Sequence, residues 1–223
     1  VEAPLALVNP YCFEPPIAPH LAAEQAGVVI DLAIIAAAFE RLAAIADIVI
    51  VEGVGGFCVP LNRSEDSADL AQRLGLPVIL VVGLRLGCLN HALLTARAIR
   101  AQGLTVAGWI ANRIDPAMAA AERNVAALAE RLAAPLLGVV EFMAAPDPGR
   151  IAAQRAVARR GRVHGGARPG AYRRSTRLFR SRQVAVNTRV RSIAQTMRQL
   201  NRNVRMVFDD LRMTKNSCPS ACV

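Results

Sequence analysis

Four short runs of apolar, largely β-branched residues recur along the chain. They occupy residues 48–51, 78–82, 106–111 and 136–140. Runs of this length without polar alternation are typical of strands buried on both faces of a parallel sheet. The segments between them carry helical spacing or Ala-rich sequence. This order predicts an α/β fold with a mainly parallel sheet, right-handed crossovers and helices on both faces.

The segment ahead of these runs is predicted to hold little regular structure. Residues 5–8 are interpreted as a short strand, and the proline-rich residues 14–20 as a rigid loop. His20 has no acid or nucleophile beside it, so it is interpreted as a loop residue near the next helix, not as a ligand. Capping residues and apolar spacing predict the helices that follow. They are residues 31–46 with Asp31 as N-cap, a short helix capped by Ser67 and closed by Gly75, residues 89–102 closed by Gly103, and residues 117–133.

Glu52 and a run of glycines follow the first predicted strand directly. An acid at the carboxyl end of a buried parallel strand lies where open α/β sheets bind ligands. Glycine lets the backbone approach a ligand closely, and a carboxylate beside bare amides can hold Mg²⁺ while the amides face phosphate. The alternative is a tight turn with a solvated Glu. These residues alone leave the two interpretations even.

The same predicted edge gathers other polar residues. A helix that starts directly after the second strand offers amides to an anion, with Arg85 adding positive charge. An ordinary loop with a solvated Arg85 explains this stretch equally well. Asn112 and Arg113 end the third strand, and residues 141–143 follow the fourth. The carboxyl ends of parallel strands share one edge, so these residues are predicted to border one site with Glu52.

Composition narrows the class of protein. No apolar run approaches the ~18 residues that a membrane span needs. The five cysteines are irregularly spaced, which excludes a disulfide framework and favours the reducing cytoplasm. Cys218 and Cys222 have no nearby His, so no metal site is predicted there. The opening residues lack the basic region of a secretory signal and an initiator Met, and we expect a fragment that begins within a strand.

Several sequence blocks, taken together, resemble one family. They are NPYCFEPPIAPH, VEGVGGFCVPL, PVILVVGLRLGCLNHALLTARAI and GLTVAGWIANRID, in the family's order. Over about residues 5–148 the chain resembles dethiobiotin synthetase, the ATP-dependent ligase of biotin biosynthesis. The LGCLNH and AGWIAN blocks are far more specific than a glycine-rich loop. The resemblance implies a P-loop-type fold, a cytoplasmic homodimer, and closure of the ureido ring of dethiobiotin from 7,8-diaminononanoate, CO₂ and ATP with Mg²⁺.

The resemblance also implies roles for individual residues. Glu52 would be a Mg²⁺ ligand. The substrate carboxylate would be received across the dimer interface by Gly87, Cys88 and Asn90. The nucleotide would be bordered by Gly53, Val54, Gly55, Asn112, Arg113, Glu141, Phe142 and Met143.

One part of the family pattern is missing. The family's amino-terminal part carries a GTDTxxGKT phosphate loop, a substrate-binding Lys and a second acidic Mg²⁺ ligand. No G-x4-GK[ST] occurs in this sequence, and its only Lys is Lys215. We therefore expect an amino-terminally truncated domain, assign no catalytic residue, and predict that the isolated chain does not catalyse the reaction.

Charge divides the chain in two. Residues 1–149 hold 9 Arg and 15 acidic residues, whereas residues 150–223 hold 18 basic residues and 2 Asp. Residues 1–148 are predicted to form the partial synthetase-like domain. Residues 149–223 are predicted to be a basic, low-order tail with a helix at 184–213. The tail is either a nucleic-acid-binding arm, with Tyr172 and Phe179 stacking on bases, or non-native sequence, and we favour the latter.

A second function remains as an alternative. The chain can be a P-loop-type ATPase or regulatory domain with a basic nucleic-acid-binding tail. The LGCLNH block favours the ligase, because a generic ATPase needs no carboxylate site there.

Overall fold

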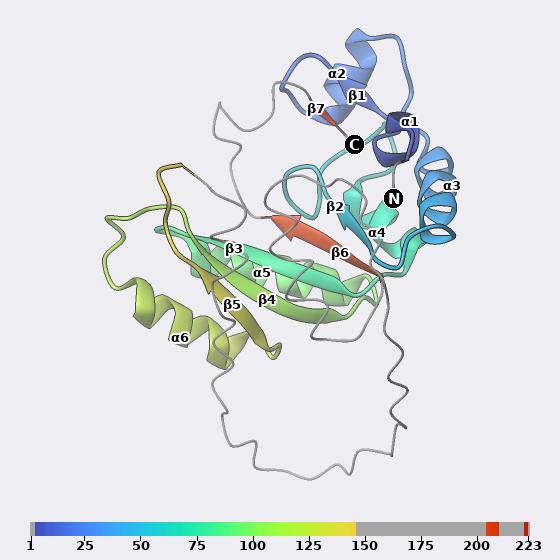
Figure 1. Cartoon of the computed structure of the whole chain (residues 1–223). Helices are drawn as coiled ribbons and strands as arrows, with labels where there is room; N and C mark the ends of the chain where they lie inside the picture. The colour runs from blue at the N-terminus through green and yellow to red at the C-terminus, as the bar shows by residue number, and fades with distance from the viewer. Residues whose placement is uncertain (1–2, 146–203, 210–220, 223) are drawn as a thin grey trace, which may run out of the picture.

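The computed structural model describes residues 3–145, 204–209 and 221–222, shown in colour in Figure 1. Its centre is a parallel five-stranded sheet. The strand order is β2 (Val49–Glu52), β6 (Val204–Asp209), β3 (Val78–Leu84), β4 (Val106–Arg113) and β5 (Leu136–Val140). A small antiparallel pair joins β1 (Cys12–Phe13) to β7 (Ala221–Cys222). The parallel α/β sheet predicted from the four apolar runs is therefore confirmed.

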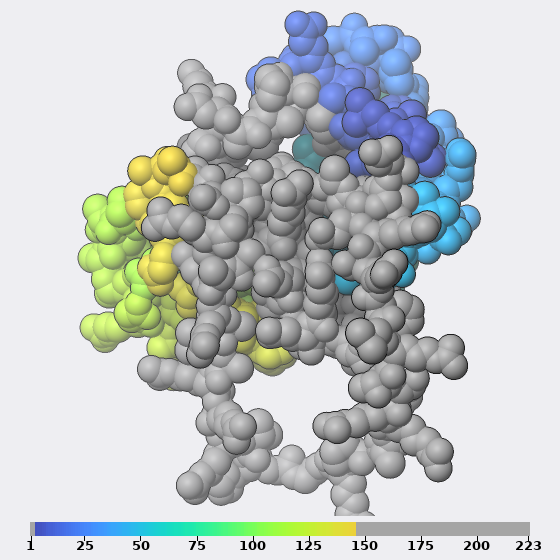
Figure 2. Space-filling model, viewed as in Figure 1, coloured from blue at the N-terminus to red at the C-terminus, as the bar shows by residue number. Residues whose placement is uncertain are grey.

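Six helices are described. They are α1 (Leu5–Val8), α2 (Pro19–Gln25), α3 (Leu32–Ala43), α4 (Ser67–Leu74), α5 (Cys88–Ala101) and α6 (Ala121–Arg131). The segment holding α1 to α3 and the segment holding β5 and α6 lie on opposite sides of the described part of the molecule (Figures 1 and 2). No described helix is both long enough and apolar enough to cross a bilayer.

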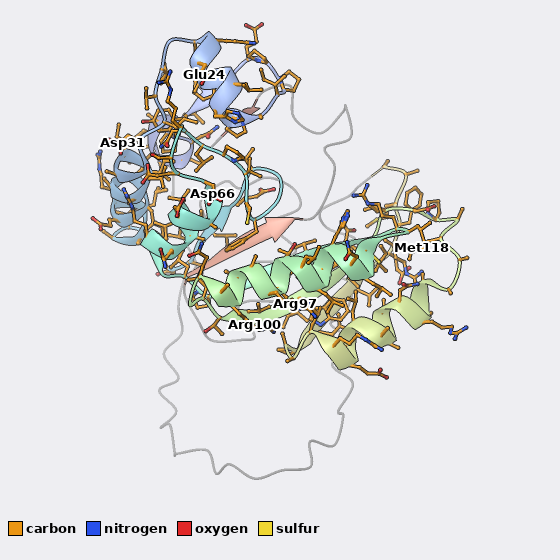
Figure 3. The ribbon with its side chains drawn as sticks, turned by 180° about the vertical axis from the view of Figure 1, so that it is seen from behind. Glu24, Asp31, Asp66, Arg97, Arg100 and Met118 are labelled. Carbon is orange, nitrogen blue, oxygen red and sulfur yellow. The ribbon has the colours of Figure 1, made fainter. Side chains whose placement is uncertain are left out.

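The main hydrophobic core joins one face of the sheet to buried residues of α2 to α6, of which α5 and α6 lie side by side in Figure 3. Every residue of β3 is buried, as a run without polar alternation predicts. Val78, Leu80 and Val82 face this core with Trp109 of β4. Burying a large apolar side chain contributes about 1.5–3 kcal/mol, so this layer accounts for much of the stability. Arg100 of α5 also donates to the carbonyl of Leu132 at the end of α6.

The other face of the sheet carries a smaller cluster. Its buried members are Ile79, Val81, Ile110 and Leu137, all from strands. Within the described ranges, this cluster includes no helix residue, so the helix layer predicted for the second face is not found there.

Helix ends follow the sequence signals in most places. Asp31 caps α3 by accepting from the Ala33 amide at 2.7 Å, and Gly75 closes α4 with a φ of 61°, as predicted. Ser67 is not the cap of α4, which is a correction. Asp66 takes that position and forms a capping box with Asp69. The Asp66 carboxylate is available to accept from the first amides of α4, whereas the Ser67 hydroxyl is already bonded to the Phe57 carbonyl.

Three local predictions are wrong for identifiable reasons. Residues 5–8 form a helical turn rather than a strand, because the amides of Val8 and Asn9 bond back to Pro4 and Leu5. His20, interpreted as a loop residue, falls inside α2, because Pro19 is the first residue of that helix and proline is well suited to this position. The helix predicted from residue 117 begins at Ala121, because Asp115 binds the following backbone in a turn that competes with the helix.

The helix predicted at 184–213 is contradicted at residues 204–209. Residues 204–209, assigned to a helix at 184–213, form strand β6, because pairing with β2 and β3 on both edges outweighs helical spacing. Residues 221–222 form β7. The rest of the tail, 149–203, 210–220 and 223, lies outside the described residues, as do Tyr172 and Phe179.

Gly108 gives a test of the sheet's packing. A Cβ at this position would lie 2.6–2.8 Å from the side chain of Leu137, which is buried on the neighbouring strand. Gly108→Ala should lower the free energy of unfolding by about 1–3 kcal/mol through overpacking, measured by urea denaturation. Gly56→Ala is the control, since its Cβ would meet nothing within 4 Å. Equal effects of the two substitutions would contradict this packing.

Candidate functional site

The carboxyl edge of the sheet is staggered rather than level. Glu52 pairs in register with Val207, which pairs with Ile79, which pairs with Gly108. Asn112 lies further along β4, opposite Gly83 and Val140. From ordinary strand spacings, Glu52 and Asn112 are roughly 20 Å apart. The predicted residues therefore form two separate ends of one edge, and only an elongated ligand can touch both.

At the Glu52 end of the sheet edge lies a glycine loop, which is held at its base by hydrogen bonds. Gly55 has a φ of 73°, a conformation that favours glycine. The hydroxyl of the buried Ser67 donates to the Phe57 carbonyl at 2.7 Å and accepts from the Val59 amide at 2.9 Å. The loop is thereby fastened to the first turn of α4, whose cap Asp66 is labelled in Figure 3. Glu52 is exposed at the mouth of this loop.

The other end is an ion-pair cluster. Arg113 Nε lies 3.0 Å from Glu141 Oε2, an ion pair without the alignment of a hydrogen bond. Its guanidinium also pairs with Glu122, in the first turn of α6. The order of the strands in the sequence predicts that Arg113 lies near Glu141, but it does not predict Glu122. An acid in the first turn of the next helix was the available signal, since such acids are common at helix starts. Phe142 is exposed beside this cluster in the chain, and Met143 is half-buried.

Between these two ends, α5 starts directly after β3. Its N-cap is Gly87, with a φ of 94° and no side-chain cap, so side chains leave its first amides open. Asn90 is exposed, whereas the thiol of Cys88 is buried. The Cys88 sulfur is therefore shielded from a ligand, and the Cys88 amide donates to the Arg85 carbonyl at 3.1 Å. Leu86, just before the helix, is 98% exposed.

Glu52 is better suited to a Mg²⁺ ion that is also bound by phosphate than to a Mg²⁺ ion held by protein ligands alone. In the part of the chain that the structure describes, no three His, Cys, Asp or Glu side chains gather where they could hold a metal. Mg²⁺ commonly takes one or two carboxylates and completes its shell with phosphate and water oxygens. A single exposed carboxylate beside a glycine loop fits that pattern.

Comparison with known proteins shows the family of the chain. A family model described as an AAA domain matches residues 1–148. The chain belongs to this AAA domain family. The P-loop-type fold expected from the resemblance is thus confirmed.

Curated relatives of this AAA domain share one name, "ATP-dependent dethiobiotin synthetase BioD". The protein of Aromatoleum aromaticum is 65% identical over 146 residues, 66% of this chain and 65% of the relative. That of Nitrosospira multiformis is 61% identical over 135 residues, 60% of each chain. That of Janthinobacterium sp. is 57% identical over 153 residues, 69% of this chain and 65% of the relative. The matches thus span 60–65% of the relatives' length.

The AAA domain also carries a thiol beside the glycine loop. Cys58 is exposed as a residue, but its sulfur is partly shielded. Burial raises the pKa of the Cys58 thiol, and the carboxylates of Asp66 and Asp69 raise that pKa further.

Alkylation of Cys58 should report this environment. The thiolate is the reactive form, so iodoacetamide labelling should reach half its maximal rate at a higher pH than for an ordinary thiol. Asp69→Asn should lower that pH by removing one of the charges. Labelling of the Cys58 peptide, followed by mass spectrometry, separates it from other cysteines. A half-maximal rate at or below the ordinary thiol pKa would contradict the assignment.

Proposed function

We propose that this AAA domain is a dethiobiotin synthetase domain, which closes the ureido ring of dethiobiotin from 7,8-diaminononanoate, CO₂ and ATP. One observation carries the proposal. A carboxylate with a glycine loop and an uncapped helix start share one sheet edge, so one edge suits both Mg²⁺-bound phosphate and a substrate carboxylate. The name shared by the three relatives supports it. No comparable observation favours the regulatory or nucleic-acid-binding alternative.

The chemistry requires an activated carbamate. One amine of the substrate adds CO₂ and loses a proton to form a carbamate. A carbamate oxygen takes the γ-phosphoryl group of ATP, releasing ADP. The second amine then attacks the carbamate carbon and displaces phosphate, closing the ring. Bound Mg²⁺ would neutralise the phosphate charge during the transfer.

The charges at the two ends of the sheet edge indicate which part of the nucleotide would bind at each end. Arg113 is compensated by Glu141 and Glu122, so it has little net charge left to attract phosphate. That end suits the uncharged adenine, bordered by Asn112, Arg113 and residues 141–143. Glu52 would then hold Mg²⁺ at the phosphate end, with Gly53, Val54 and Gly55 along the nucleotide.

The start of α5 would receive the substrate carboxylate. Gly87 and Cys88 would act through the backbone, and Asn90 through its exposed amide. We propose a homodimer in which the partner subunit covers Leu86, since a leucine that is 98% exposed beside a binding site favours burial. A cytoplasmic location agrees with Cys58 and Cys88, which are thiols.

Asn90 tests the carboxylate site. Binding is the readout because no G-x4-GK[ST] phosphate loop occurs in these 223 residues, and we expect no turnover from them alone. Asn90→Ala should weaken 7,8-diaminononanoate binding about tenfold, the loss of one hydrogen bond to a carboxylate, measured by calorimetry. Arg97→Ala, about two turns further along the same helix, is the control (Figure 3). If the decarboxylated diamine binds equally well, the proposed function fails.

Glu52 tests the metal and phosphate end. Glu52→Gln should abolish the part of ATP affinity that depends on Mg²⁺ and leave the affinity in EDTA unchanged, because the amide is a poor Mg²⁺ ligand. Fluorescent ATP-analogue titration with and without Mg²⁺ measures both. Glu40→Gln, an exposed acid on α3, should change neither. An equal loss in both conditions would remove Glu52 from the metal site.

A further inference from the structure

Strand β6 fills a gap between two strands of the sheet. Residues 204–207 pair with β2, and residues 206–209 pair with β3. The described ladders do not join β2 directly to β3. Adjacent strands are about 4.8 Å apart, so without β6 the facing edges of β2 and β3 would stand roughly 10 Å apart. The gap is one strand wide, and we call it the β2–β3 slot.

The slot needs an occupant for physical reasons. β3 is buried along its whole length, and its backbone amides and carbonyls on the slot side have no water to replace a partner strand. Ile79 and Val81 face one core, and Val78 and Leu80 face the other. An occupant must therefore be parallel, extended and apolar on both faces.

β6 is far from β5 along the sequence. The 63 residues 141–203 separate β5 from β6, far more than a usual crossover. The entropy of closing a long loop changes slowly with its length, so this separation adds little to the cost of exchanging the strand. Among the described elements, the main contacts of β6 are with β2 and β3, through strand pairing. A strand held mainly by pairing can be displaced by another of the same chemistry.

We propose that the β2–β3 slot is an exchangeable strand-binding site, whose partner is an extended apolar peptide that binds parallel to both strands. Val204–Asp209 is the occupant in this structure. The slot also borders the candidate phosphate end. Glu52 is level with Val207, so residues 208 and 209 of the occupant run past the end of β2. Whichever strand occupies the slot thus determines which groups emerge beside Glu52.

Paired prolines test the slot in the full chain. Adjacent residues of a parallel strand bond to opposite neighbours, so Val207→Pro with Phe208→Pro removes a donor toward each side. Amide exchange in β2 and β3 should rise at least tenfold. A synthetic peptide of residues 203–210 should restore protection, whereas the same peptide with both prolines should not. Protection that stays at the wild-type level in the proline variant would overturn the proposal, as would failure of the peptide to restore it.

The wild-type chain provides a second test that does not depend on how the proline variant folds. A fluorescein-labelled 203–210 peptide should bind it with rising anisotropy and be displaced by unlabelled peptide. Absence of binding would overturn exchange. A concentration-dependent dimer that the prolines abolish would instead identify a second copy as the donor and overturn the peptide partner. None of these readouts uses ATP or diaminononanoate, so failure here is separate from failure of the proposed function.

Discussion

The rest of the structure depends on burying β3 with both of its edges paired. Val78–Leu84 is buried at every residue, so each amide and carbonyl must find a partner within the sheet. On one side β4 provides that partner, and α5 returns directly across the face to cover it. On the other side the partner is β6, from far along the sequence. The register of the whole sheet follows from this strand.

That register also sets the shape of the candidate site. Because β3 and β4 run on past the level of Glu52, the carboxyl edge descends toward β2. The compensated Arg113 cluster lies at the far end, and the exposed Glu52 with its glycine loop at the low end. Strands β6 and β3 therefore separate a polar but electrically balanced region at the end of β4 from the exposed carboxylate of Glu52 at the end of β2.

Much of this arrangement was predictable from the sequence where local chemistry decides the structure. The uninterrupted apolar runs identified four strands, and Asp31, Gly75 and Gly103 marked helix ends. Apart from two errors in local turns, at residues 5–8 and before Ala121, the failures arose where a distant partner decides the structure. Residues 204–209 have helical spacing, but two open strand edges outweigh it. Ser67 has a capping side chain, yet its hydroxyl is used by the backbone of a loop ten residues earlier. Glu122 joins the Arg113 cluster because α6 packs back toward the end of its preceding strand. The spacing of residues in the sequence does not reveal this packing.

The Ser67 hydroxyl has a wider consequence. It joins the backbone shape of the glycine loop to the first turn of α4, so the loop cannot change conformation without loosening that helix. The conformation of the glycine loop and the stability of α4 are then thermodynamically coupled. A ligand that selects the ordered loop would slow the opening of α4, although it touches no residue of that helix. Conversely, a substitution that frays α4 would be measured as lost affinity at a distance, and would look like damage to the site itself.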